Sequence, residues 1–293
     1  TTTGYTLNIT GGTLTTGQLN LNSSNATLTI TGAGSFTSGA LNFNTSENTL
    51  NLISGGSLTT GEINLDTSGI STISGTGTLT STEINFNANN ANFNYSNSNT
   101  LNVDQINLNT DDSIISGTGV LTATAVNFNT EGAALNVTNN NGLTTDQINL
   151  EASDSSNTIE GTNNIVAQEI NFNANNISFD ISSTARGVET GEINNNGSGN
   201  ILYVAGDEGG LSISGTGITG SDPLTIIVNG SDSTLGFLNS ATAGDATITV
   251  DSDNTLTFEN SSSAGTATLT NDGGTINFDQ SSNSIGTPNI VSN

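Results

Sequence analysis

Apolar and polar residues alternate in short runs along the whole chain, and one run returns at a nearly constant interval. A representative copy is Ile84-Asn85-Phe86-Asn87, a tetrad in which two apolar residues alternate with two asparagines. Successive copies begin 22, 22, 21, 22, 20, 22, 22 and 23 residues apart, which is typical of stacked repeats. The copies begin at the anchor residues Leu19, Leu41, Ile63, Ile84, Ile106, Val126, Ile148, Ile170 and Ile193, and we interpret Leu211, Leu235, Leu256 and Ile276 as a weaker continuation.

Each interval contains further short alternating runs that are separated by corners. In the first interval, Thr6-Leu7-Asn8-Ile9 precedes a corner at Gly11-Gly12, and Thr13-Leu14-Thr15-Thr16 follows it. Period-two alternation indicates strands with one face inward, and Gly or Asn supplies the positive φ that corners need. The sequence therefore predicts an all-β chain, a right-handed parallel β-helix with three short strands in each coil of 21–22 residues and about 13 coils.

The third tetrad position predicts how the core is filled. It alternates between Leu and Phe through Leu21, Phe43, Leu65, Phe86 and onward to Phe172. Stacked coils would place these side chains in one column, where large and smaller residues alternate without a run of stacked rings. The outward asparagines of neighbouring coils are expected to form amide ladders.

The repeat changes character along the chain, which predicts three segments of one continuous solenoid. Residues 1–179 hold regular Asn-rich coils, and residues 180–234 are expected to form irregular coils with protruding loops. Residues 235–293 repeat a different cadence, seen in Phe258-Glu259-Asn260-Ser261-Ser262-Ser263-Ala264-Gly265-Thr266-Ala267-Thr268-Leu269-Thr270.

This cadence resembles the passenger regions of bacterial autotransporters, and the Asn-rich coils are similar to those of outer-membrane-protein-type surface adhesins. The resemblance implies an extracellular location at a bacterial cell surface, attached to the outer membrane. It also implies a non-enzymatic stalk or adhesin whose partner is a protein or glycan on a host or neighbouring cell. The signal region and membrane barrel of such proteins have no counterpart in this sequence, so we expect the chain to be part of a longer protein.

Composition narrows the possible partners. The 293 residues include 26 acidic residues and a single Lys or Arg, Arg186, and the net charge is -25. Such a chain cannot neutralise phosphates, which argues against binding to nucleic acid or to an anionic membrane. Cysteine and histidine are both absent, which removes Cys-ligated metals and the commonest general base. We predict no cofactor other than calcium.

Carboxylates in equivalent positions of adjacent coils are the calcium candidates. Glu62 and Glu83 both precede an anchor, and so do Glu169 and Glu192, so each pair is expected to lie close together on the outside. Like charges at short distance favour capture of a cation, and oxygen ligands suit Ca²⁺. Two loop pairs, Asp111-Asp112 and Asp207-Glu208, are further candidates. The alternative interpretation is that all these carboxylates are exposed and hydrated.

Three other functions were weighed against the adhesin. A polysaccharide-cleaving β-helix enzyme would need Arg186 as its base beside Asp180 and Glu189, whereas a solvated loop arginine is the simpler interpretation. Ice binding would need threonine pairs such as Thr27-x-Thr29 to occupy one column through consecutive coils, and they do so only briefly, near the C terminus. A structural subunit of a surface layer or filament would associate end to end through uncapped strand edges.

Overall fold

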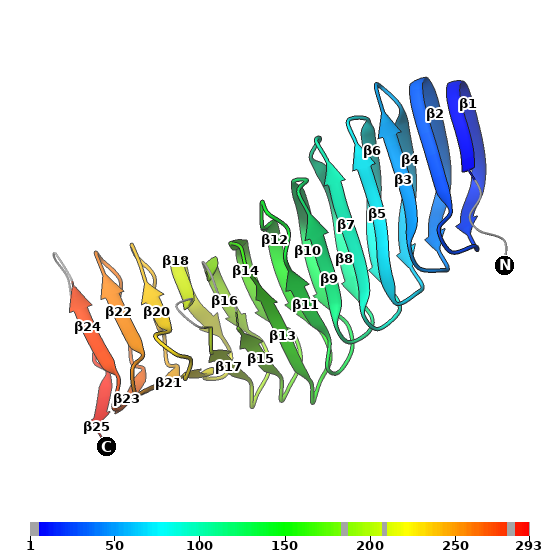
Figure 1. Cartoon of the computed structure of the whole chain (residues 1–293). Coiled ribbons are helices and arrows are strands. Elements are labelled where there is room, and N and C mark those ends of the chain that lie inside the picture. Colours follow the sequence, from blue (N-terminus) through cyan, green and yellow to red (C-terminus); the bar gives the residue numbers. More distant parts are fainter. Residues whose placement is uncertain (1–5, 183–186, 207–209, 280–284, 293) are drawn as a thin grey trace. The chain divides into compact units, whose positions relative to one another are not determined.

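The computed structural model describes residues 6–182, 187–206, 210–279 and 285–292. Its regular elements are all β-strands of a parallel β-solenoid of about 12 turns, as Figure 1 shows. The contacts divide the chain into unit 1, residues 1–127 and 133–144, and unit 2, residues 128–132 and 145–293. Over the described ranges, no helix is long and apolar enough to cross a membrane.

Unit 1 contains the regular Asn-rich coils. Its strands are β1 (Thr6–Leu21), β2 (Thr27–Phe43), β3 (Asn48–Ile53), β4 (Ser57–Leu65), β5 (Gly69–Gly75), β6 (Thr78–Phe86), β7 (Ala91–Asn97), β8 (Leu101–Leu108), β9 (Ser113–Gly117), β10 (Leu121–Phe128), β11 (Ala134–Val137) and the start of β12 (Leu143–Leu150).

Unit 2 contains the remaining strands. These are β13 (Ser156–Gly161), β14 (Ile165–Phe172), β15 (Ser178–Ile181), β16 (Val188–Asn195), β17 (Ile201–Val204), β18 (Gly210–Gly220), β19 (Thr225–Val228), β20 (Thr234–Phe237), β21 (Thr247–Asp251), β22 (Thr255–Glu259), β23 (Thr268–Asp272), β24 (Thr275–Asp279) and β25 (Asn289–Ser292).

The tetrads of unit 1 stack in register, as the repeat predicts. Ile84 of β6 lies between Ile63 and Ile106 of the neighbouring coils, and Phe86 lies between Leu65 and Leu108. The side chains at these positions are at most 1% exposed. The alternation of Leu and Phe in one core column is therefore confirmed in this unit.

Each regular coil has three sides, but two of them belong to one bent strand. In β6, Leu79 and Ser81 point inward, Thr82 and Glu83 both point outward, and Ile84 points inward again. Two consecutive outward residues break the alternation and mark a corner. The predicted three strands per coil therefore match roughly, although β1 and β2 each continue through a whole coil and the coils from β3 to β12 have one short and one long strand.

A column of hydroxyl groups stabilises this corner, which sequence reasoning missed. Thr60 Oγ1 donates to the carbonyl oxygen of Glu62 at 2.9 Å, and Ser81 Oγ donates to that of Glu83 at 3.0 Å. Ser38 Oγ also donates to Thr60 Oγ1 at 3.1 Å, so adjacent coils are linked. The available signal was the Ser or Thr that stands three residues before many anchors.

Asparagine and glycine occupy left-handed positions at turns, as predicted. Asn25 and Asn90 have φ values of 61° and 59°. Gly61 serves a different need at the bent corner, because a Cβ there would lie 2.7 Å from the carbonyl oxygen of Gly39 in the preceding coil. Close stacking of backbones thus selects glycine at this corner.

The last four anchors were placed on the wrong side of the coil. Ile193 pairs with Ile218, whereas Leu211 pairs with Val188 in another column of unit 2. That column continues through Leu235, Leu256 and Ile276. The physical reason is that every side shows the same period-two alternation, so spacing alone does not identify the side.

The coil number is about 12 and not 13.

After Ile218, the side of the coil that contains the tetrads is filled by smaller side chains. The backbone N–H of Ile218 donates to Thr242, and that of Ala243 donates to Ser263, which brings Ala243 and Ala264 into the place of the larger residues. Both alanines are fully buried. In the same coils Phe237, Phe258 and Phe278 stack face to face, with ring centroids 5.0 and 5.1 Å apart.

Candidate functional site

Outward asparagines on the tetrad strands of unit 1 form a continuous row of side-chain hydrogen bonds. Each amide donates from Nδ2 to Oδ1 of the asparagine in the preceding coil. The donors and distances are Asn42 to Asn20, 2.6 Å; Asn64 to Asn42, 2.8 Å; Asn85 to Asn64, 2.8 Å; Asn107 to Asn85, 2.8 Å; and Asn127 to Asn107, 2.9 Å. The predicted amide ladder is confirmed, and we call it the amide row.

A second set of amides lies two residues after the first, directly beyond the ends of the same strands. Asn44 donates to Asn22, Asn87 donates to Asp66 and Asn109 donates to Asn87. The distances from Nδ2 to the acceptor oxygen are 2.5, 2.8 and 2.9 Å. Residues two apart on a strand share a face, so both sets project from one side of unit 1.

Unit 2 has a shorter row of the same kind. Asn171 donates to Asn149 at 2.9 Å, and Asn194 donates to Asn171 at 2.8 Å. Thr219 Oγ1 lies 2.5 Å from Asn194 Oδ1, so a hydroxyl takes the next position. The amide chemistry of this side is therefore replaced where the alanine coils begin.

The glutamates predicted to stack are register partners. Glu62 pairs with Glu83 in unit 1, and Glu169 pairs with Glu192 in unit 2. Their carboxylates accept hydrogen bonds from neighbouring side chains: Asn64 Nδ2 to Glu62 at 3.3 Å, Gln147 Nε2 to Glu169 at 3.1 Å and Thr219 Oγ1 to Glu192 at 2.9 Å. Calcium on these pairs stays a prediction.

The aspartate candidates occupy turns. Asp111 and Asp112 follow β8, both are exposed, and Asp112 has a φ of 52°. Asp207 and Glu208 lie outside the described residues. Within the described part of the chain, no group of three or more His, Cys, Asp or Glu side chains could hold a metal ion.

An open hollow of about 420 Å³ lies on unit 2 over β14, β16 and β18. It forms because Ser214, Gly215 and Thr216 of β18 all stand opposite Gly191 of β16, between the pairs Thr190–Ile213 and Glu192–Gly217. A Cβ on Gly215 would lie 2.6 Å from the Gly191 carbonyl oxygen. The backbone of β16 therefore packs directly against Gly215, where no side chain fits.

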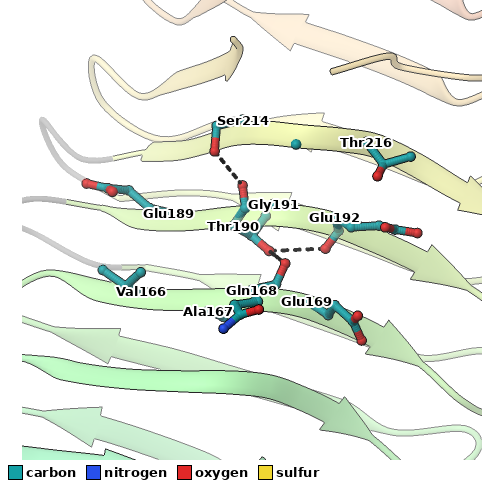
Figure 2. Close-up of a pocket in the computed structure, with 11 residues that line it drawn as sticks. Val166, Ala167, Gln168, Glu169, Glu189, Thr190, Gly191, Glu192, Ser214 and Thr216 are labelled. Carbon is teal, nitrogen blue, oxygen red and sulfur yellow. Dashed lines mark hydrogen bonds between the residues drawn. The ribbon is translucent and has the colours of Figure 1, made fainter. Parts of the chain in front are cut away.

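The polar groups of this hollow do not converge on one point. Figure 2 shows Glu189 at one end and Glu169 and Glu192 at the other. At the centre, Thr190 Oγ1 donates toward the carbonyl oxygens of Glu192 and Gln168, at 3.1 and 3.3 Å (Figure 2). The central hydroxyl is thus used in holding adjacent coils together. Sequence reasoning missed this hollow, because the extra residues of β18 were interpreted as loop.

The residues considered for polysaccharide cleavage are spread over several elements. Arg186 lies outside the described residues, Glu189 lines the hollow and Asp180 points outward from β15. Burial and then the nearby charge of Glu160 raise the pKa of the Asp180 carboxyl. Its Oδ1 atom is buried and has no hydrogen-bond partner among the residues that the structure describes. The environment of Asp180 on β15 therefore disfavours the charged form of its carboxyl group.

Tyr95 also has a shifted pKa, and it belongs to the core. Burial raises the pKa of its phenol to about 12. The hydroxyl donates to the carbonyl oxygen of Asn99 at 2.7 Å, and the side chain is fully buried. This geometry gives Tyr95 a packing role.

The fold and these rows of polar side chains define the class of protein as a parallel β-solenoid repeat protein. Comparison with known protein families, with curated proteins and with solved structures gave no match. The class therefore follows from the strand pairing and the repeat.

Proposed function

We propose that the chain is a non-enzymatic, extracellular β-solenoid of a bacterial surface protein, acting as a stalk and adhesin. The observation that supports this most is the parallel pairing of successive coils in unit 1, from Thr6–Thr27 in the first pair, which has one register shift between Ile9 and Gly11, to Val137–Ile115 in the last. Coils that share their core with neighbours add length with each repeat. A stalk needs that property, and binding groups then project from its polar sides.

The composition supports exposure to solvent at the cell exterior. A net charge of -25 keeps a long repeat protein soluble and opposes sticking to anionic surfaces. The outward faces of the tetrad strands carry amides and carboxylates, whereas the aliphatic and aromatic residues lie inside.

Immunogold electron microscopy on the source cells, with antibodies raised against the purified chain, tests this proposal. We expect label on the outer face of the envelope, and beads coated with the chain should adhere to host or neighbouring cells. Beads coated with the heat-denatured chain are the control. Label confined to the cell interior, or equal adhesion of both bead types, would contradict the proposal.

A structural subunit of a surface layer or filament is the second candidate. On β1, Leu7 and Leu14 are 40% and 42% exposed, and on β25, Ile290 is 57% exposed. Such apolar strand edges pair readily with another strand. Sedimentation of the purified chain at rising concentration checks this candidate: continuous filaments support it, and a monomer throughout contradicts it.

A further inference from the structure

We propose that the amide row of unit 1 binds a linear, uncharged, β-linked polysaccharide laid along the axis of stacking. This deepens the proposed function, because it names the partner class and the contact surface of the same solenoid. The binding residues are Asn42, Asn64, Asn85 and Asn107, together with the second set at Asn44 and Asn87.

The first step is the orientation of the amides. Each donates its ladder bond to the preceding coil, so all Nδ2 and Oδ1 atoms of the row point in fixed directions. A primary amide has two N–H donors and an oxygen that accepts two hydrogen bonds, and the ladder uses one of each. For Asn85, which is half-buried, one donor and one acceptor position therefore remain for an outside partner.

The second step is spacing. Neighbouring strands lie about 4.8 Å apart, and residues two apart on one strand lie about 7 Å apart. The two sets of amides therefore form a two-dimensional grid. A β-linked glycan in its extended form places one hydroxyl-bearing ring near each strand spacing, so successive sugars can meet successive coils.

The third step is chemical selectivity. A sugar hydroxyl donates and accepts hydrogen bonds, which matches an amide. Anionic glycans are disfavoured because Glu62 and Glu83 lie on the same strands as the row, Asp66 directly follows β4, and the whole chain has a net charge of -25. The ladder also fixes the asparagine rotamers before binding, which lowers the entropic cost of association.

The experiment compares two triple variants of the full chain. The row variant is Asn64→Thr, Asn85→Thr and Asn107→Thr. The matched control is Asn51→Thr, Asn92→Thr and Asn94→Thr, three half-buried asparagines that point outward from β3 and β7 on another side of unit 1. Threonine keeps a strand-compatible side chain, and circular dichroism with thermal melting confirms that each variant is folded.

Retention on insoluble cellulose and chitin is measured, with soluble alginate as the anionic probe. We expect the parent and the control to be retained, and the row variant to lose roughly tenfold or more in apparent affinity, because several weak contacts act together. Three results would each overturn the inference: equal retention of the row variant and the control, no retention of the parent on either neutral glycan, or preference for alginate. A fourth result would also overturn the inference: the parent chain associates with itself, the row variant does not, and neither retains a glycan.

Failure here and failure of the proposed function are distinguishable. Envelope label with cell adhesion but without glycan retention removes only the amide-row inference. Glycan retention with label inside the cell removes only the surface function.

Discussion

The corner before the tetrad side differs between the regular coils of unit 1 and the last coils of unit 2. In unit 1 the corner column contains Ser38, Thr60 and Ser81, which bond to each other or to the backbone. In unit 2 the column changes from Thr190 to Ile213 and then to the stacked rings of Phe237 and Phe258. The corner column is thus filled in two ways, by hydroxyl side chains that form hydrogen bonds or by stacked phenyl rings.

This difference between the two corners shows how the total volume of the core side chains in a coil is kept constant. Coils with a small hydroxyl at the corner have Ile or Leu at the anchor, as in the pair Thr60 and Ile63. Coils with Phe at the corner have buried alanines on the following side, Ala243 and Ala264. Because interiors are close-packed, a large residue on one side requires a small one on another. The first two predictions below test this rule of volume balance, and the other two test polar groups, the corner hydroxyl and the Asp180 carboxyl.

The largest effect is expected for Phe258→Ala. The ring is fully buried between Phe237 and Phe278, and its loss leaves a cavity that alanine-lined coils cannot fill. We expect a loss of about 3–5 kcal/mol of local stability, measured by hydrogen exchange of β21 to β24. Phe258→Leu is the control and should cost less than half of this. Equal protection in the parent and the alanine variant would mean that the stack does not stabilise these coils.

Gly119→Ala tests volume balance inside unit 1. A Cβ at this position would lie 2.4 Å from Cδ1 of Tyr95, a large core side chain. Overpacking should cost about 1–3 kcal/mol, seen as a lower melting temperature. Tyr95→Leu in the same chain should recover part of that loss, because it frees the space. Additive losses in the double variant would show that the two residues do not compete for volume.

Thr60→Val tests whether the hydrogen bonds of the corner hydroxyl groups stabilise unit 1. The side chain keeps its shape, but the Glu62 carbonyl loses a donor and Ser38 loses its acceptor. A loss of about 1–2 kcal/mol in the free energy of unfolding is expected. Thr59→Val, at the exposed neighbouring position, is the matched control and should be nearly neutral. If both variants behave alike, the corner is stabilised by packing alone.

Asp180→Asn should have the smallest effect on stability, and the size of that effect depends on pH. The folded-state pKa of Asp180 is raised above its usual value of 3.8, so the folded state holds the proton more tightly than the unfolded state. Stability of the parent therefore falls as pH rises from that value through the raised pKa. The variant should melt slightly higher than the parent at pH 7, and the difference should vanish below pH 3.8.

Glu160→Gln is the companion variant, because the Glu160 charge is the second cause of the shift. It should reproduce part of the gain at pH 7. A parent that melts higher than Asp180→Asn at neutral pH would mean that the charge stabilises β15.

Sequence alone determined the period of the repeat, the parallel stacking and the inward positions of the tetrads. Ile84 and Phe86 were placed correctly because a shift of one residue would expose every apolar side chain of the strand. The in-register pairs Glu62–Glu83 and Glu169–Glu192 followed from the same period.

Only the tertiary structure decided which side of a coil each apolar residue belongs to. Leu211 alternates with polar neighbours just as Ile193 does, yet it pairs with Val188 in another column. The Ile193 column continues at Ile218, because the extra residues of β18 opposite Gly191 come before Ile218. The hollow and the phenyl stack follow from that choice of side. The physical reason is that alternation records inward or outward orientation, whereas the position of corners depends on how neighbouring coils pack and hydrogen-bond.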